Sequence, residues 1–209
     1  EAVQAGVTIE KIFALESYRD QLAAFPQTVW VSEEILRDLA DTQTPQGIVA
    51  VIQKEEVGPP DFSQGKFLFL EDVQDPGNVG TMIRTADAAG LTGVIVSDKS
   101  ADIYSLKTLR SMQGSHFHLP IYRMPVATFI EEAKKSNLPI LATTLSRDSK
   151  DYRELSPLEN FALVMGNEGQ GISPIMAESA NQLVHIGMKG RAESLNVAVA
   201  AGILMFYFS

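Results

Sequence analysis

The stretch "KFLFLEDVQDPGNVGTMIRTADAAGLTGVIVS", residues 66–97, indicates the fold of this chain of 209 residues. Two short apolar runs, "KFLFLE" and "GVIVS", enclose a segment that predicts a helix over residues 78–90. Apolar runs separated by a helix are typical of parallel strands that are covered on both faces. The stretch therefore predicts a strand-helix-strand unit of an α/β protein.

The same alternation continues to the end of the chain. Further strands are predicted within "LPIYR", "PILATTL", "FALVMG" and "QLVHIGM", which cover residues 119–123, 139–145, 161–166 and 182–188. Further helices are predicted over residues 105–113, 126–136, 173–180 and 193–207. We expect residues 66–209 to form a mostly parallel sheet with helices on both faces.

The first 56 residues follow a different pattern. They predict two strands and a helix that begins at Ser32 with acidic residues in its first turn, over residues 28–31, 47–53 and 32–41. Gly and Pro residues then break any regular element, so we expect a linker over residues 57–65. We expect a small α/β domain over residues 1–56, truncated because it begins with Glu, and a larger domain over residues 66–209.

Composition excludes several classes of protein. The chain has no Cys, which excludes disulfides, thiolate catalysis and Cys-ligated zinc. His116 and His118 have no third ligand at a helpful spacing, so we expect no metal. The apolar stretches are much shorter than the roughly 20 residues of a membrane-spanning helix, and no signal segment opens the chain. We therefore expect a cytoplasmic protein that has no contact with a membrane.

The net charge of −9 argues against simple electrostatic binding of nucleic acid, because phosphate contacts depend on Lys and Arg. Much of the acid lies in the first 56 residues. An RNA-binding protein of this composition would need a local basic surface or a dimer whose surfaces combine. The candidates for such a surface are Lys107, Arg110, Lys189 and Arg191.

In α/β sheets, ligands bind outside the carboxyl ends of the strands, so the loops that follow "FLFL", "LATT", "LVMG" and "VHIGM" are the candidate site. In the first loop, Asn78 is a candidate helix cap. Arg84 follows in a helix whose other residues are mostly apolar or small. A guanidinium there must pair with an acidic neighbour or face a site or an interface, because burying it alone is costly.

A second loop, "VMGNEGQGIS" at residues 164–173, is rich in glycine. Gly166, Gly169 and Gly171 surround Glu168 and allow the backbone to approach a ligand closely. The spacing GxxGxG matches neither a dinucleotide fingerprint nor a phosphate loop. A carboxylate in such a loop suits a ligand that has a cationic or amino group.

The third loop leads into the last helix, in "VHIGMKGRAESLNVAVAAG" at residues 184–202. Ser194 and Asn196 flank Leu195, and they have two interpretations: they cap the helix, or they line a ligand site. Backbone groups of Ile186 and Met188 can bond an adenine edge while Leu195 covers its face. Both interpretations can hold at once.

Three stretches, "NVGTMIRTADAAG", "VMGNEGQGIS" and "IGMKGRAESLNVAVAAGILMF", resemble the three motifs of the SpoU (TrmH) family of RNA ribose 2′-O-methyltransferases in the SPOUT superfamily. They occur in the family's order, and the resemblance covers roughly residues 66–209. It implies a deep C-terminal trefoil knot, S-adenosylmethionine as cofactor and a homodimer. The N-terminal segment resembles the small ribosomal-protein-like RNA-binding domain of many members.

The resemblance also implies the site residues. The catalytic positions are Asn78, Arg84, Glu168, Ser194 and Asn196. We expect the cofactor to contact Thr143, Gly166, Glu168, Gly171, Ile186, Met188, Leu195 and Asn196. We expect Arg84 to stabilise negative charge on the attacking oxygen, since a guanidinium is a poor proton acceptor. Glu168 would fix Arg84 or a polar group of the ligand.

One position departs from the family pattern. Gly187 stands between Ile186 and Met188, where the family usually has proline. Because proline stiffens the backbone, we expect Gly187 to loosen cofactor binding without removing a reacting group.

The predicted function is methyl transfer from S-adenosylmethionine to a ribose 2′-hydroxyl of structured RNA. Ribosomal RNA is favoured over transfer RNA by the resemblance of the N-terminal segment. Two alternatives stay open: a transfer RNA ribose methyltransferase, and a non-catalytic RNA-binding factor in ribosome assembly. A third, a nucleotide-dependent oxidoreductase, is disfavoured because no GxGxxG follows the first strand of the sheet.

Overall fold

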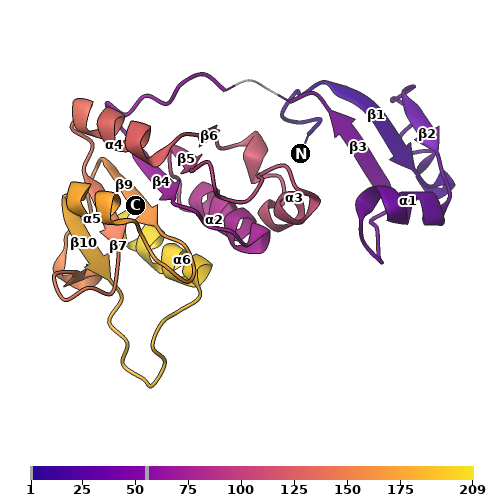
Figure 1. Ribbon diagram of the computed structural model, residues 1–209. Helices are drawn as coiled ribbons and strands as arrows, with labels where there is room; N and C mark the ends of the chain where they lie inside the picture. The colour runs from indigo at the N-terminus through magenta and orange to yellow at the C-terminus, as the bar shows by residue number, and fades with distance from the viewer. Residues whose placement is uncertain (1, 55–56) are drawn as a thin grey trace. The chain divides into compact units, whose positions relative to one another are not determined.

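The computed structural model describes residues 2–54 and 57–209. The chain divides into two compact units, residues 1–56 and 57–209. Figure 1 shows a small sheet with one helix in the first unit and a larger sheet flanked by helices in the second.

The first unit is built on a three-stranded sheet of order β2-β1-β3. Strand β1 (Ile9–Ala14) pairs in parallel with β2 (Thr28–Trp30) and antiparallel with β3 (Ile48–Ile52). Helix α1 (Glu33–Ala40) begins as predicted, because the Ser32 hydroxyl accepts a hydrogen bond from the Ile35 N–H. The central strand β1 was not predicted, since the apolar residues of "IEKIFA" do not alternate.

The second unit contains a seven-stranded sheet in which every pairing is parallel, in the order β6-β5-β4-β9-β7-β10-β8. Its strands are β4 (Lys66–Leu70), β5 (Gly93–Val96), β6 (Ile121–Arg123), β7 (Ile140–Thr143), β8 (Lys150–Asp151), β9 (Phe161–Met165) and β10 (Gln182–His185). This large parallel sheet with its helices confirms the predicted fold class. The short edge strand β8 was not predicted.

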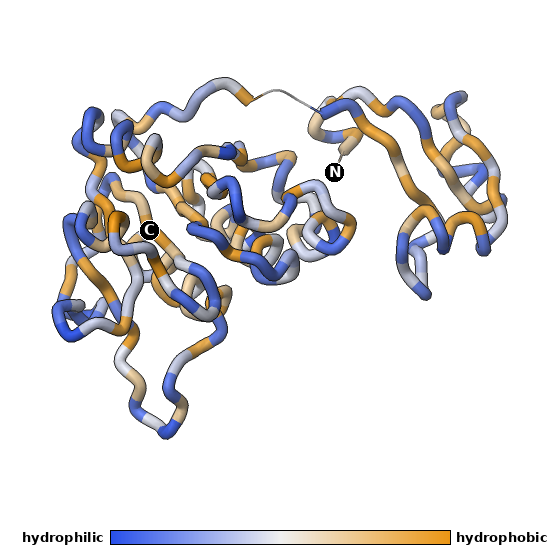
Figure 2. Tube along the Cα trace, viewed as in Figure 1, coloured by the Kyte–Doolittle hydropathy of each residue, from blue (hydrophilic) through white to orange (hydrophobic). Residues whose placement is uncertain are grey.

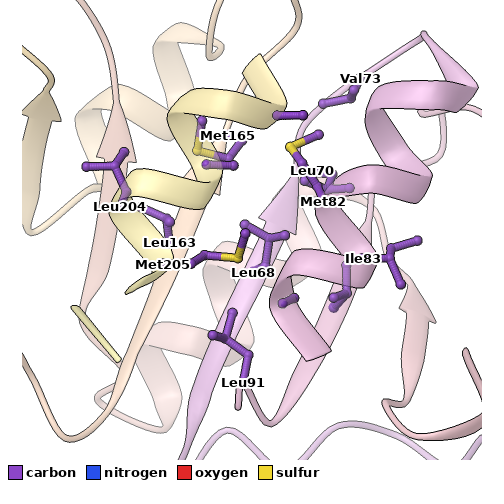
Figure 3. Close-up of a cluster of buried hydrophobic side chains, with 14 of the residues drawn as sticks. Leu68, Leu70, Val73, Met82, Ile83, Leu91, Leu163, Met165, Leu204 and Met205 are labelled. Carbon is purple, nitrogen blue, oxygen red and sulfur yellow. The ribbon is translucent and has the colours of Figure 1, made fainter. Parts of the chain in front are cut away.

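Alternate residues of the strands build two separate cores. Leu68 and Leu70 of β4 face a core that includes residues of α2 (Pro76–Ala88), α3 (Leu106–Met112) and α6 (Val197–Phe208). Phe67 and Phe69 face the other core, with residues of α4 (Val126–Lys135) and α5 (Pro174–Ser179). Figure 3 shows Leu68 and Leu163 beside Met205 in the first core. The period of two in the strands thus determines which helix covers which face.

Several boundaries differ from the predictions, and each difference has a local cause. Helix α2 begins two residues early, because Asp75 accepts hydrogen bonds from the N–H groups of Gly77 and Asn78, and Pro76 fits the first helical position. Strands β7 and β10 end at Thr143 and His185, two and three residues before their predicted ends. The residues beyond these ends form the loops that line the site.

The predicted linker also differs from the structure. Phe62, inside residues 57–65, is only 4% exposed and packs edge-on against Phe67 and Phe129. The second half of that segment is therefore part of the larger unit. Over the described residues, no helix is both long and apolar enough to cross a membrane.

Candidate active site

A cavity of about 660 Å³ lies beyond the carboxyl ends of three neighbouring strands, β9, β7 and β10, and at the start of α6. Its lining includes all eight residues predicted to contact a cofactor: Thr143, Gly166, Glu168, Gly171, Ile186, Met188, Leu195 and Asn196. Ser194 lines it as well. The loops come from distant parts of the sequence and meet because their strands are neighbours in the sheet.

The glycine loop after β9 is folded tightly back on itself. The N–H and carbonyl groups of Asn167 and Gly171 pair with one another, at 3.0 and 2.9 Å. A Cβ at Gly166 would collide with the backbone of Gly171 and Ile172, and Gly171 has a φ of +71°. Two of the three glycines are thus required by the backbone path, which presents Glu168 at the rim of the cavity.

Three side chains from the three predicted motifs form one chain of hydrogen bonds. The Asn196 Nδ2 donates to Asn78 Oδ1 at 3.1 Å, and the Asn78 Nδ2 donates to Glu168 Oε1 at 3.0 Å. Asn78 lies in the first turn of α2, so its side chain is free of the capping role that Asp75 has taken. The chain of bonds connects the beginnings of α2 and α6 with the glycine loop.

The Glu168 carboxylate also anchors the loop that precedes α2. Its two oxygens accept hydrogen bonds from the backbone N–H groups of Gln74 and Asp75, both at 3.2 Å. Partial desolvation acts to raise the pKa of Glu168, but the hydrogen bonds from Asn78 and the backbone outweigh it and the pKa is lowered. Glu168 is therefore an ionised acceptor at neutral pH, and its contacts are with Asn78 rather than with Arg84.

Asn196, and not Ser194, caps the last helix. Its Oδ1 accepts hydrogen bonds from the N–H groups of Ala198 and Val199, at 2.9 and 3.3 Å. Helix α6 begins at Val197, four residues later than predicted, and residues 186–196 form a long loop whose tip is hydrophilic (Figure 2). Ser194 is exposed on this loop at the cavity wall.

Arg84 lies outside the cavity lining. It is exposed on α2, and among the residues that the structure describes it makes no hydrogen bond or ion pair. The described part of the single chain thus shows no structural ion pair for Arg84. Helices α2 and α6 are in contact, and Thr85 of α2 lies close to Gly202 of α6: a Cβ built on Gly202 would be 3.6 Å from the Thr85 Cγ2. Arg84 precedes Thr85 in the chain, so its exposed side chain lies next to this contact between the two helices.

Other lining residues were missed by sequence reasoning. They include Thr144, Leu145 and Ser146 after β7, Asn167, and His185. Leu145, the last residue of the predicted run "PILATTL", lies in the loop that follows "LATT" and is 69% exposed, because β7 ends at Thr143. The pattern "NEG" was an available signal for Asn167, whose Oδ1 accepts from the N–H groups of Gly169 and Gln170 in a side-chain turn.

The chemistry of the lining suits an amphipathic small molecule. Apolar side chains of Met165, Val184, Ile186 and Leu204 form one part, and the Glu168 carboxylate with the Ser194 and Asn196 side chains forms another. A largely apolar cavity with a few convergent polar groups is typical of cofactor sites. Within the described ranges, no group of three or more His, Asp or Glu residues is arranged to hold a metal.

The cavity and the three connected motifs agree with the comparison to known families. The profile of the SpoU rRNA Methylase family matches residues 65–206, which is most of the chain. The chain belongs to the SpoU rRNA methylase family. This confirms the family recognised from the three motifs, and with it an RNA methyltransferase that uses S-adenosylmethionine.

Individual members resemble this SpoU methylase to different extents. The 23S rRNA (guanosine(2553)-2′-O)-methyltransferase RlmP of Bacillus subtilis is 39% identical over 99% of this chain and 83% of its own length. A structure of an AdoMet-bound rRNA methyltransferase from Sinorhizobium meliloti has a TM-score of 0.87 and 33% identity, over 99% of this chain and 81% of that one. A TrmH/SpoU tRNA modifying enzyme of A. aeolicus has 34% identity and a TM-score of 0.62, over 68% of this chain and 72% of its own.

Proposed function

We propose that this chain transfers a methyl group from S-adenosylmethionine to a ribose 2′-hydroxyl of ribosomal RNA of the large subunit. The observation that carries the proposal is similarity over almost the whole chain, both units included, to a 23S ribosomal RNA 2′-O-methyltransferase. The transfer RNA enzyme matches only about two thirds of the chain. That difference favours ribosomal RNA over transfer RNA, and we expect a cytoplasmic enzyme.

The cavity fits the proposed cofactor. Its apolar part, with Ile186, Leu195 and Leu204, matches the adenine ring, and its polar rim matches the ribose hydroxyls and the amino acid part. We propose that backbone groups of Ile186 and Met188 bond the adenine edge. When bound there, S-adenosylmethionine supplies an activated methyl group.

The side chains around the cavity would orient the reacting groups. Ser194 and Asn196 stand at the cavity wall, where they can hold the ribose or the cofactor. Asn78 and Glu168 keep Asn196 in place through the chain of hydrogen bonds. A ribose hydroxyl is a poor nucleophile, so we propose that the Arg84 guanidinium stabilises the negative charge that develops on its oxygen.

We also propose that the enzyme acts as a homodimer. Val199, Ile203 and Phe206 repeat at helical spacing on α6 and are all exposed, Phe206 by 60%. Arg84 is exposed next to the contact of α6 with α2 and does not line its own cavity. A second copy on this face would bury the apolar stripe and bring Arg84 to an interface.

A mixing experiment tests where Arg84 acts. Arg84→Ala and Asn196→Ala are each expected to be inactive. If Arg84 serves the partner's cavity, mixed dimers contain one complete site and regain part of the activity. If it serves its own cavity, the mixture stays inactive.

We infer that residues 1–56 help to bind the RNA. This unit holds ten acidic and four basic side chains, a net charge of −6, so shape and hydrogen bonds to the 2′-hydroxyls must contribute more than charge. A chain that begins at residue 57 should bind S-adenosylmethionine normally and bind ribosomal RNA more weakly. Equal RNA affinity of the two chains would contradict this role.

We further infer that the larger unit contains the trefoil knot that its family resemblance implies. Support comes from the path of the chain, which leaves the sheet at β10, the neighbour of the edge strand β8, and returns along the cavity loops to pack α6 against α2. Pulling the chain at residues 66 and 209 should give a contour length shorter than the extended chain. The full contour length would exclude a knot.

The decisive experiment for the function is to map 2′-O-methyl groups in ribosomal and transfer RNA from cells with and without the protein. We expect loss of one methyl group in large-subunit ribosomal RNA. Loss from transfer RNA would favour the alternative substrate. A purified protein that shows no saturable binding of S-adenosylmethionine would favour a non-catalytic RNA-binding factor.

A further inference from the structure

The loop that follows β10 is fastened to the edge strand β8 by one side chain. The backbone N–H of Gly187 donates a hydrogen bond to Asp151 Oδ2 at 3.1 Å. Gly187 lies between Ile186 and Met188, both of which line the cavity. The bond therefore holds the backbone at the point where the strand has ended and the cavity wall begins.

Asp151 is itself held in place. Its Oδ1 accepts hydrogen bonds from the Nε and the backbone N–H of Arg153, at 2.8 and 3.0 Å, and its Oδ2 accepts from Arg153 Nη2 at 2.7 Å. The register of β8 against β10 places Asp151 opposite His185, two residues before Gly187. The Asp151 side chain is only 15% exposed, so the acceptor that faces Gly187 is fixed in position.

The charge state of Asp151 suits this role. The Arg153 guanidinium, by hydrogen bonding the carboxylate, holds the pKa of Asp151 well below its usual range. The carboxylate therefore stays ionised at every pH at which the enzyme would work. It accepts bonds and has no proton to donate.

The identity of residue 187 matches this contact. A Cβ at Gly187 would lie 2.5 Å from Asp151 Oδ2, so a larger residue would push the carboxylate away. Proline would in addition have no N–H to donate. The expected loss of stiffness at Gly187 is thus offset by a bond that only a small residue with an N–H can make here.

We infer that Asp151 is a positioning residue of the cofactor site: it holds Gly187 so that the backbone of Ile186 and Met188 is presented to S-adenosylmethionine. The inference rests on the proposed function, since it takes the cavity as the cofactor site. Asp151 does not line the cavity, and it acts through the loop.

The first test compares Asp151→Ala with the wild-type protein by calorimetric titration of S-adenosylmethionine and S-adenosylhomocysteine. We expect both ligands to bind about tenfold more weakly, the size expected for a hydrogen bond to a charged group. Equal weakening distinguishes positioning from attraction by charge, because the sulfur is cationic only in S-adenosylmethionine. The turnover number at saturating cofactor should stay within about twofold, since cofactor binding alone is weakened.

A matched control is Asp61→Ala, which removes another carboxylate that accepts a backbone N–H, here from Ser63, away from the cavity. It should leave both affinities unchanged. Hydrogen exchange of the ligand-free protein gives a second readout. Asp151→Ala should speed exchange at the Gly187 amide, and Asp61→Ala should not.

The second test is a double-mutant cycle with Gly187→Pro, which removes the N–H donor and retains both Asp151 and Arg153. In the otherwise wild-type protein, Gly187→Pro should weaken S-adenosylmethionine binding about tenfold, because the hydrogen bond to Asp151 is lost and the proline ring conflicts with the Asp151 carboxylate. In the Asp151→Ala protein, Gly187→Pro should weaken binding less than about twofold, because the carboxylate that accepts the bond and obstructs the ring is already absent. Gly187→Pro leaves the residues of the edge strand unchanged, so this single variant still tests the bond to the Gly187 N–H if Asp151→Ala does not fold.

Wild-type affinity in Asp151→Ala, or two fully additive substitutions, would overturn the positioning role. Unequal weakening of the two ligands would also overturn it, in favour of a direct charge effect. A wild-type protein that binds neither ligand would instead overturn the proposed function, and the exchange experiment would still test the tether itself.

Discussion

At the scale of single residues, Asn196 performs two tasks with one side chain. Its Oδ1 caps α6, and its Nδ2 donates to Asn78. Asn196 is thus both the cap of this apolar helix and part of the cavity lining. Because the two tasks use different atoms, substitutions can separate them.

Asn196→Asp keeps the capping oxygens and removes the donor to Asn78. We expect its stability in urea to match the wild type, with turnover reduced at least about tenfold, since a site hydrogen bond is lost. Asn196→Ala should lose about 1 kcal/mol of stability as well. An active Asn196→Asp enzyme would show that the cap alone explains this residue.

Arg84→Ala tests the proposed charge stabilisation. We expect methyl transfer to fall by about a hundredfold or more, as for loss of an oxyanion-stabilising donor. Affinity for S-adenosylmethionine, measured by calorimetry, should be unchanged because Arg84 does not line the cavity. Arg84→Lys serves as a control that keeps the charge and loses the planar guanidinium. A turnover near that of the wild type in Arg84→Ala would refute the assignment.

At the scale of elements, the site depends on a loop that only glycine can build. The turn between β9 and α5 is closed by the pairing of Asn167 with Gly171. Gly166 lies against the backbone of Gly171 and Ile172, with no room for a side chain. This contact places Glu168 where it can anchor the loop before α2.

Gly166→Ala should open that turn. We expect a loss of about 1–3 kcal/mol of stability, the usual range for overpacking, together with weaker binding of S-adenosylmethionine. Gly169→Ala is the matched control, because a Cβ there would meet only Asn167 Oδ1, at 3.6 Å. Thermal unfolding and cofactor titration of both variants measure the effect, and equal behaviour of the two would contradict it.

The contribution of Glu168 to stability should depend on pH. Folding lowers the pKa of Glu168 from its ordinary value of 4.5. The ionised carboxylate therefore contributes fully to the free energy of unfolding above pH 4.5, and this contribution is lost as the pH falls through the lowered pKa of the folded protein. In urea unfolding, Glu168→Gln should be less stable than the wild type at pH 7. The difference should shrink below pH 4.5, and a difference that is constant with pH would exclude this account.

At the scale of the whole molecule, the exposed stripe on α6 is the surface that dimerisation would explain. Val199, Ile203 and Phe206 remain uncovered in the single chain, although the other face of α6 is packed in the core. An apolar stripe of this kind is typical of an interface. Assembly would also explain why Arg84 stands outside its own cavity.

Phe206→Glu should convert dimers to monomers, because it places a charge in the proposed interface. Sedimentation velocity at several concentrations measures the outcome. Ile175→Glu on α5, which changes a residue that is 52% exposed elsewhere, is the control and should not alter the assembly. A Phe206→Glu protein that stays dimeric would exclude this face as the interface.

The sequence by itself determined most of the helices and strands of the larger unit and the family to which the chain belongs. Apolar runs separated by helices predicted the parallel strands, because strands buried on both faces must be apolar. The resemblance of the three motifs to those of the SpoU family implied Asn78, Glu168 and Asn196 as site residues, and the strand ends indicated which loops form the candidate site. These are local properties, set by residues near one another in the chain.

Only the tertiary structure decided which loops meet and which bonds they make. Strand β9 lies between β4 and β7, although it follows both in the chain, and this order brings Glu168 to Asn78. The two-residue strand β8 carries no clear pattern, yet it delivers Asp151 to Gly187. Contacts of this kind join residues 36 to 118 positions apart, and a local pattern contains no information about such pairs because long-range packing of the sheet creates them.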